Sequence, residues 1–171
     1  MPNDQPLKPI QYWVERLGLE PHPEGGAYVE TYRSPARHAG DAAGFPTGRC
    51  FATGIYFLVP AGEFSALHRI RSDELWHFYY GAPLEIVVLD GAGELAVKTL
   101  GLALEQGQAP QHVVAAGAWF GASVATDTGY ALVGCTVSPG FDFCDFELAK
   151  RDELSALYPE HAPLIERYTR T

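Results

Sequence analysis

The sequence from Cys50 to Leu148 consists of short segments with the composition of β-strands, and this pattern constrains the fold more than any other feature. Segments rich in Val, Ile, Tyr and Phe recur at intervals of about 8 to 12 residues, separated by turn-forming groups such as Pro60-Ala61-Gly62. The spacing predicts strands near 51–59, 63–70, 74–80, 84–90, 94–100, 111–115, 119–125, 130–138 and 142–148. Because no helical segment alternates with these strands, we expect an all-β sandwich or barrel rather than a parallel sheet.

Helical patterns flank this region on both sides. Near the amino terminus, apolar residues with helical spacing predict a helix at about 9–18; they are Ile10, Trp13, Val14 and Leu17. Near the carboxyl end, two similar groups predict short helices within about 150–168; they are Leu154, Leu157 and Tyr158, then Leu164, Ile165 and Tyr168. We expect a single domain over residues 1–171, with the barrel at about 26–148.

The segment before the strand-rich region begins with the turn-forming letters PHPEGG and continues as AYVETYRS, which favours a strand. Side-chain alternation places Tyr28, Glu30 and Tyr32 on one face of this strand, with Arg33 on the other. An acidic residue in a tight turn, such as Glu24, is more often part of the turn than of a catalytic site. The loop that follows, at 34–48, is expected to be irregular. The histidines outside the strands, His22, His38 and His161, are most simply solvated.

Composition excludes several classes of partner. The 171 residues are 47% apolar, enough for one buried core, and 12 basic against 21 acidic residues give a net charge of -9. This charge disfavours nucleic acid and anionic membrane surfaces. The first residues do not resemble a leader peptide and the longest apolar stretch is too short to span a bilayer, so we expect a cytoplasmic protein. Three widely spaced cysteines predict neither disulfides nor a thiolate zinc site.

The stretch from Gly62 to Gly81, GEFSALHRIRSDELWHFYYG, concentrates the candidate chemistry. Alternation along its two strands turns His68 inward on the first, and Glu74, Trp76, Phe78 and Tyr80 to one face of the second. An imidazole beside a carboxylate in an aromatic pocket is a plausible general acid/base pair. The alternative is that His68 and Glu74 are core residues that satisfy one another through a hydrogen bond.

The spacing Gly62-x5-His68-x-Ile70-x3-Glu74-x6-Gly81 resembles the first motif of the cupin superfamily, G-x5-H-x-H-x3-E-x6-G, apart from the second histidine. Four further segments resemble the small, uncharacterised "cupin five" branch; they are HPEGGAYVETYRS, SDELWHFYYG, VVAAGAWFGA and VSPGFDFCDFEL. The resemblance implies a cupin jelly-roll β-barrel with flanking helices, a ligand pocket inside the barrel and a homodimeric assembly.

The chain departs from the metal-binding members of that superfamily at two of their four ligand positions. Ile70 stands in place of the second histidine, and Phe120 stands where the second motif would supply another. A catalytic zinc site normally keeps three protein ligands, so His68 and Glu74 alone would hold a metal weakly. We therefore predict no metal and no cofactor. A variant metal site would need to recruit His77 or His112, which requires a bulge or an unusual strand path.

The resemblance extends more distantly to metal-independent dTDP-sugar 3,5-epimerases, which use a barrel histidine as a base. By this analogy we predict an isomerase or epimerase acting on a carbohydrate-like carbonyl compound, with His68 as base and Glu74 as its orienting partner. The expected ligand-binding residues are Trp76, Phe78, Tyr80, Phe120, Ile70, Tyr28 and Arg33. The alternatives are a non-catalytic protein that binds a sugar-like or aromatic small molecule, and a variant metal-dependent cupin.

Overall fold

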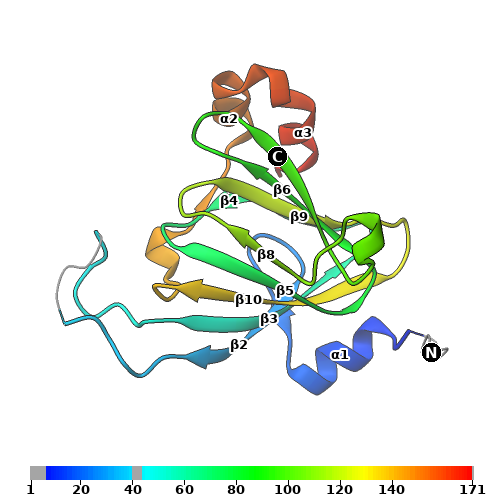
Figure 1. Cartoon of the computed structure of the whole chain (residues 1–171), viewed down its shortest axis with the longest axis horizontal. Helices are drawn as coiled ribbons and strands as arrows, with labels where there is room; N and C mark the ends of the chain where they lie inside the picture. The colour runs from blue at the N-terminus through cyan, green and yellow to red at the C-terminus, as the bar shows by residue number, and fades with distance from the viewer. Residues whose placement is uncertain (1–6, 40–43, 171) are drawn as a thin grey trace.

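The computed structural model describes residues 7–39 and 44–170, whose strands form two antiparallel sheets packed face to face (Figure 1). The six-stranded sheet has the order β1-β2-β3-β10-β5-β8, and the five-stranded sheet the order β11-β4-β9-β6-β7. The strands are β1 (Glu20–Pro21), β2 (Ala27–Arg33), β3 (Thr53–Pro60), β4 (Phe64–Arg69), β5 (Asp73–Gly81), β6 (Leu84–Leu89), β7 (Leu95–Leu100), β8 (Gln111–Val114), β9 (Trp119–Val124), β10 (Tyr130–Ser138) and β11 (Glu147–Leu148). This is the predicted all-β cupin jelly roll.

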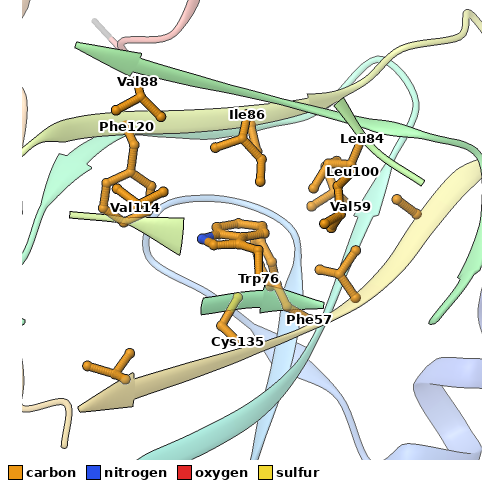
Figure 2. Packing of buried hydrophobic residues seen from close by; sticks show 14 of the residues in the cluster. Phe57, Val59, Trp76, Leu84, Ile86, Val88, Leu100, Val114, Phe120 and Cys135 are labelled. Carbon is orange, nitrogen blue, oxygen red and sulfur yellow. The ribbon is translucent and has the colours of Figure 1, made fainter. Parts of the chain in front are cut away.

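The main hydrophobic core lies between the two sheets, where inward side chains interdigitate around Trp76 (Figure 2). Trp76 is 1% exposed and packs edge-on against Phe57 and Phe120, with ring centroids 5.9 and 6.3 Å away. Ile86 and Leu100, from the five-stranded sheet, close over the same region. The alternation of inward apolar residues therefore produces the expected sandwich core.

The helices cover the outer faces of the sheets. Helix α1 (Ile10–Leu17) packs against the six-stranded sheet around Leu58 and Leu132. The carboxyl-terminal elements are α2 (Arg151–Leu157), η3 (Pro159–His161) and α3 (Ala162–Arg167), and α2 and α3 pack on the five-stranded sheet around Trp119 (Figure 1). The predicted helices are present at both ends. No helix within the described ranges is long and apolar enough to cross a bilayer.

Three register shifts change the side-chain alternation expected from the sequence, and one of them lies on β4 between Ser65 and His68. The register between β2 and β3 shifts between Glu30 and Tyr32, so Thr31 is the extra residue. The register between β10 and β5 shifts where Tyr79 is inserted between Phe78 and Tyr80. Each shift reverses the face of the residues that follow it, a reversal that the period-two pattern could not predict.

One predicted strand is largely wrong. Within 142–148, three residues form a 3₁₀ turn, η2 (Phe143–Asp145), and the two-residue β11 follows. The side chain of Asp142 accepts a hydrogen bond from the backbone N–H of Cys144, an Asx-type contact that favours a turn over an extended strand. A second 3₁₀ turn, η1 (Leu104–Gln106), lies between β7 and β8. Residues 40–43 of the loop expected at 34–48, and 1–6 of the amino terminus, lie outside the described part of the chain.

Candidate functional site

A cavity of about 110 Å³ lies inside one end of the barrel, between the six-stranded sheet and β4. Titratable groups and aromatic rings share its lining. The lining residues are His22, Glu24, Tyr28, Glu30, Arg33, Thr53, Ile55, His68, Ile70, Glu74, Cys135, Val137, Phe141, Phe143 and Phe146. The enclosed space is smaller than the 300 Å³ or more that is typical of pockets for drug-sized ligands, so it admits a small molecule or the end of a larger one.

Glu24 enters this cavity from the turn between β1 and β2. Gly25 adopts φ +115°, and a Cβ there would lie 2.3 Å from the backbone oxygen of Phe64, so the turn can approach β4 only with glycine. The backbone oxygen of Glu24 accepts hydrogen bonds from the N–H of Ala66 and from the Arg170 guanidinium. Gly25 thus allows the turn to dock on β4 with the carboxyl group inside the barrel, and Gly26 allows the same turn to approach the backbone of Leu58 on β3.

His68 and Glu24 form a buried pair. Nδ1 of His68 lies 2.8 Å from the backbone oxygen of Ala66, which can only accept, so Nδ1 carries a proton. Nε2 of His68 lies 3.1 Å from Oε2 of Glu24, and the other carboxyl oxygen accepts a hydrogen bond from the Ser65 hydroxyl. Because neutral His68 then has a lone pair on Nε2, one proton is shared between the imidazole and the Glu24 carboxyl group.

Burial governs where that proton resides. Loss of solvation raises the pKa of Glu24 to about 8, against the lowering effects of the Ser65 hydrogen bond and the Arg170 charge. Burial also lowers the pKa of His68, although the charge of Glu74 acts in the opposite direction. The favoured state at neutral pH is therefore a protonated Glu24 beside a neutral His68. Burial, with the nearby His68, lowers the pKa of His22 to about 4, so His22 is also neutral.

Glu74 is the second carboxyl group of the cavity. Burial raises its pKa to about 7, the charge of His68 lowers it and the charge of Glu24 raises it again. The nearby Cys135 thiol on β10 lowers the pKa of Glu74 in its turn. An ionised carboxylate has about four acceptor positions, so Glu74 retains acceptor capacity toward the cavity. Its pKa near neutrality suits a group that both takes and gives protons.

The mouth of the cavity combines an ion pair with three phenylalanines. Arg33 donates to both carboxyl oxygens of Glu30, at 2.9 and 2.5 Å, and to the backbone oxygen of Phe141. The rings of Phe141, Phe143 and Phe146 lie at 71–81° to one another. This segment is held to the protein by the buried Arg49, which pairs with Asp145 and donates to the backbone oxygen of Gly140.

Five of the nine predicted site residues line the cavity, namely His68, Glu74, Ile70, Tyr28 and Arg33. Arg33 does so because the bulge at Thr31 turns it to the same face as Tyr28 and Glu30, while Tyr32 is turned outward and is 53% exposed. This reverses the expected placement of Tyr32 and Arg33. The predicted catalytic and binding roles of these residues remain predictions.

The other four predicted residues lie elsewhere. Trp76, Phe78 and Phe120 pack in the core, although the Phe120 ring also contacts His68, with centroids 4.1 Å apart. Tyr80 lies on the opposite face of the sheet, against Trp13 of α1, because of the bulge at Tyr79. The indole Nε1 of Trp76 has no hydrogen-bond partner among the described residues. In Figure 2 this nitrogen points away from Leu84 and Leu100.

Ten lining residues were not predicted for the site, and two of them matter most for its chemistry. The sequence pattern predicts that Glu24 belongs to a turn and that His22 is solvated. Both side chains are instead 8% exposed, and both line the cavity. Glu24, rather than Glu74, is the carboxyl group in contact with His68. The available signal was the pair of glycines that follows Glu24, since glycine permits close approach of one backbone to another.

The donor set does not fit the four-ligand metal site of metal-binding cupins. Ile70 and Phe120 have no donor atom, and the described residues contain no group of three or more His, Cys, Asp or Glu side chains arranged to hold a metal ion. The two histidines considered as substitutes have other partners. His77 contacts Thr136 and Gln111, and His112 contacts the backbone oxygen of Thr99.

A jelly-roll barrel with titratable side chains gathered inside one end has the architecture of a cupin. The chain belongs to the family described as Cupin_5, Cupin superfamily (DUF985), whose model matches residues 11–149. It is similar to a hypothetical protein from Leishmania major, with 37% identity, 96% of this chain and 100% of that chain covered, and a TM-score of 0.89. No functionally curated protein matches the sequence.

Two further solved structures extend these similarities. A protein from Shewanella oneidensis is 40% identical, with 96% of this chain and 99% of that chain covered and a TM-score of 0.87. A cupin 2 domain-containing protein from Halorhodospira halophila is 20% identical, with 89% and 88% covered and a TM-score of 0.56, and so shares the fold alone. These similarities define the family and the fold.

Proposed function

We propose that this cupin is a small-molecule enzyme that catalyses proton transfer next to a carbonyl group, as an isomerase or epimerase does. The single observation that supports this most strongly is the presence, in one small cavity, of the His68–Glu24 pair and of Glu74. Pairs of titratable groups with pKa values near neutrality are more frequent at catalytic sites than elsewhere.

The geometry favours Glu74 rather than His68 as the base. Both ring nitrogens of His68 already have partners, Ala66 at Nδ1 and Glu24 at Nε2. In the proposed reaction, the Glu74 carboxylate takes the proton from the carbon next to the carbonyl, and the electrons of that C–H bond form a C=C bond. The proton shared by Glu24 and His68 passes to the carbonyl oxygen, which gives an enol. Return of one proton to the opposite face of the carbon gives the epimer, while the enol proton goes back to the Glu24–His68 pair and the carbonyl re-forms. Where the reacting carbon bears a hydroxyl group, addition of the proton to the former carbonyl carbon, with loss of that hydroxyl proton to the pair, gives the isomer.

The substrate is a small carbonyl compound without a phosphate group. Arg33 is the arginine that lines the cavity, and it is occupied by Glu30. Phosphate recognition normally uses arginine or lysine donors that are free to bind the anion. A nucleotide-sugar of the kind used by the dTDP-sugar epimerases therefore suits this cavity less well than a short sugar-like ketone or aldehyde.

Hydrogen exchange tests this proposal. Small aldoses and ketoses are incubated with the protein in D₂O, and deuterium at the carbon next to the carbonyl is measured by NMR. We expect Glu74→Gln to lower the exchange rate by about 10²-fold or more, and the exposed Glu63→Gln to leave it unchanged. Exchange that survives Glu74→Gln would contradict this assignment. Binding without exchange for the whole panel would favour a non-catalytic binding protein.

We also propose that the protein acts as a homodimer through the outer face of its six-stranded sheet. Beyond the area covered by α1, this face carries uncharged residues, of which Tyr32, Tyr79 and Val113 are 53%, 48% and 46% exposed. A neutral face permits two copies of a chain with net charge -9 to meet with little repulsion.

Light scattering coupled to size-exclusion chromatography tests the dimer. We expect twice the chain mass for the wild type and a single chain mass for Tyr79→Arg. Leu157→Arg is the matched control, because Leu157 is 63% exposed on α2, away from this face. A wild-type monomer, or a dimer that tolerates Tyr79→Arg, would contradict the proposed interface.

A further inference from the structure

We infer that the cavity binds a small organic cation, with its charged group held between the phenylalanine rings of the mouth and the carboxyl groups of Glu24 and Glu74. This inference rests on the proposed function in using the same cavity, and it defines the substrate class more narrowly: a carbonyl compound that carries a protonated amine. The lining charges, the aromatic mouth and the free acceptor positions of Glu74 support it independently.

The cavity lining contains more acidic than basic side chains. Three carboxyl groups face the cavity, from Glu24, Glu30 and Glu74, against one permanent cation, Arg33. Glu30 neutralises Arg33 through two hydrogen bonds, which leaves Glu24 and Glu74 without a permanent positive partner in the lining. The remaining titratable groups are His22, His68, the phenol of Tyr28 and the thiol of Cys135, and none of them is a permanent cation. Because Glu24 keeps its proton at neutral pH, the carboxylate of Glu74 is the negative charge that this lining leaves unbalanced, and a positively charged ligand would balance it.

The mouth offers aromatic surfaces suited to a cation. Phe141 and Phe143 have centroids 4.9 Å apart at 81°, and Phe146 lies 6.0 Å from Phe143 at 75°. Tyr28 completes the aromatic part of the lining. The negative faces of such rings attract ammonium groups, most strongly where water is partly excluded. The exposed Phe143 is poorly explained by core packing, since 53% of its surface remains open to solvent.

Hydrogen-bonding capacity leads to the same ligand class. Among the described residues, the Cys135 thiol is the neighbouring group that acts on Glu74 as a weak donor, although a carboxylate accepts several hydrogen bonds. A protonated amine supplies donors and no acceptor, so it complements a carboxylate that lacks donors. The net charge of the chain, -9, further favours the approach of cations from solution. An ammonium group near the reacting carbon would also make its C–H bond more acidic.

A pair of probes of equal size tests the inference. Tetramethylammonium and tert-butanol each have five heavy atoms and differ in charge, and their binding to the full-length protein is followed by NMR through the shift of their methyl signals. At pH 8 we expect the cation to bind at least about tenfold more tightly than the alcohol, with an upfield shift caused by the phenylalanine rings. Between pH 5 and pH 7 its affinity should rise by up to about tenfold per pH unit, as bound protons are displaced.

Variants assign the cation preference to the named groups. Glu74→Gln should abolish the preference while keeping the weak binding of tert-butanol, and Phe143→Leu should reduce cation affinity several-fold. The exposed Glu63→Gln should change neither, and thermal unfolding confirms that each variant is folded. Equal affinity for the two probes, or a preference that survives Glu74→Gln, would overturn the inference. Deuterium exchange into a neutral ketose without cation binding would refute this inference alone, and cation binding without exchange into any carbonyl compound would refute the proposed function alone.

Discussion

The two ends of the barrel interior are built from the same strands but are filled differently. On β5, Glu74 lines the cavity, whereas Trp76, two residues later on the same face, lies in the packed hydrophobic core. On β10 the change occurs between Val133, in the packed end, and Cys135, at the border of the cavity. The strands alone therefore do not decide which end is open. The turn that carries Glu24 and the segment that carries Phe141, Phe143 and Phe146 add the polar and aromatic lining.

The largest expected difference between the two ends is in stability. Trp76→Ala removes a fully buried ring from the packed end and should lower the free energy of unfolding by about 3–5 kcal/mol. Phe143→Ala, at the mouth of the cavity, removes a ring that is 53% exposed and should cost less than about 1 kcal/mol. Denaturant unfolding at pH 7 measures both. Similar losses would show that the mouth is as tightly packed as the core.

A second prediction concerns hydrogen bonding at the cavity end. Glu24→Ala leaves Ser65 and Nε2 of His68 without their buried partner and should cost about 1–3 kcal/mol. Glu24→Gln should cost much less at pH 7, because a neutral amide can donate to Nε2 and accept from the Ser65 hydroxyl as the protonated acid does. Denaturant unfolding measures both variants. A loss for Gln as large as for Ala would indicate an ionised Glu24 beside a protonated His68.

The packed end was largely predictable from the sequence, because its strands follow the period of two, apart from the bulge at Tyr79 that turns Tyr80 outward, and its turns are marked by proline and glycine. The inward direction of Glu74 follows from the same alternation, whereas the register shift between Ser65 and His68 means that alternation along β4 does not by itself give the face of His68. The resemblance to the first cupin motif identified the strands that carry both residues. These predictions depend on local pattern, which determines the face of each residue as long as the strand is regular.

The cavity end was predictable only in part, because its features are not local. The bulge at Thr31 turns Arg33 inward, a second register shift precedes His68 on β4, and no composition signal marks either of them. The contact of Glu24 with His68 joins residues 44 positions apart through a turn that docks on β4. Alternation within one strand contains no information about such a contact.

The pH dependence of stability provides a third comparison. The pKa values of Glu24 and Glu74 are raised from 4.5 to about 8 and about 7, so the folded state keeps protons that the unfolded state has lost. Stability should therefore fall as pH rises from 6.5 to about 8, by up to about 1.4 kcal/mol per pH unit for each carboxyl group. Below pH 6.5, neutral His22, whose pKa is lowered to about 4, opposes this trend.

Thermal or denaturant unfolding across this pH range measures the slope. Glu74→Gln removes one of the two carboxyl groups and should flatten the decline, whereas the exposed Glu94→Gln should not. A substitution in the packed end, such as Ile86→Val, should lower stability equally at every pH, because Ile86 is not titratable. An unchanged slope in Glu74→Gln would show that Glu74 does not hold a proton in the folded state at neutral pH.

The smallest expected effect concerns two tyrosines that the sequence pattern assigned to the same pocket. Tyr28 lines the cavity, whereas Tyr80 packs against Trp13 on the outer face. Tyr80→Phe should change stability by less than about 0.5 kcal/mol and leave tetramethylammonium affinity and deuterium exchange unchanged. Tyr28→Phe removes a hydroxyl group from a cavity residue and should alter the affinity or the exchange rate several-fold. A larger functional effect at Tyr80 than at Tyr28 would mean that the inserted Tyr79 does not turn Tyr80 away from the ligand, and that regular alternation along β5 describes the site better.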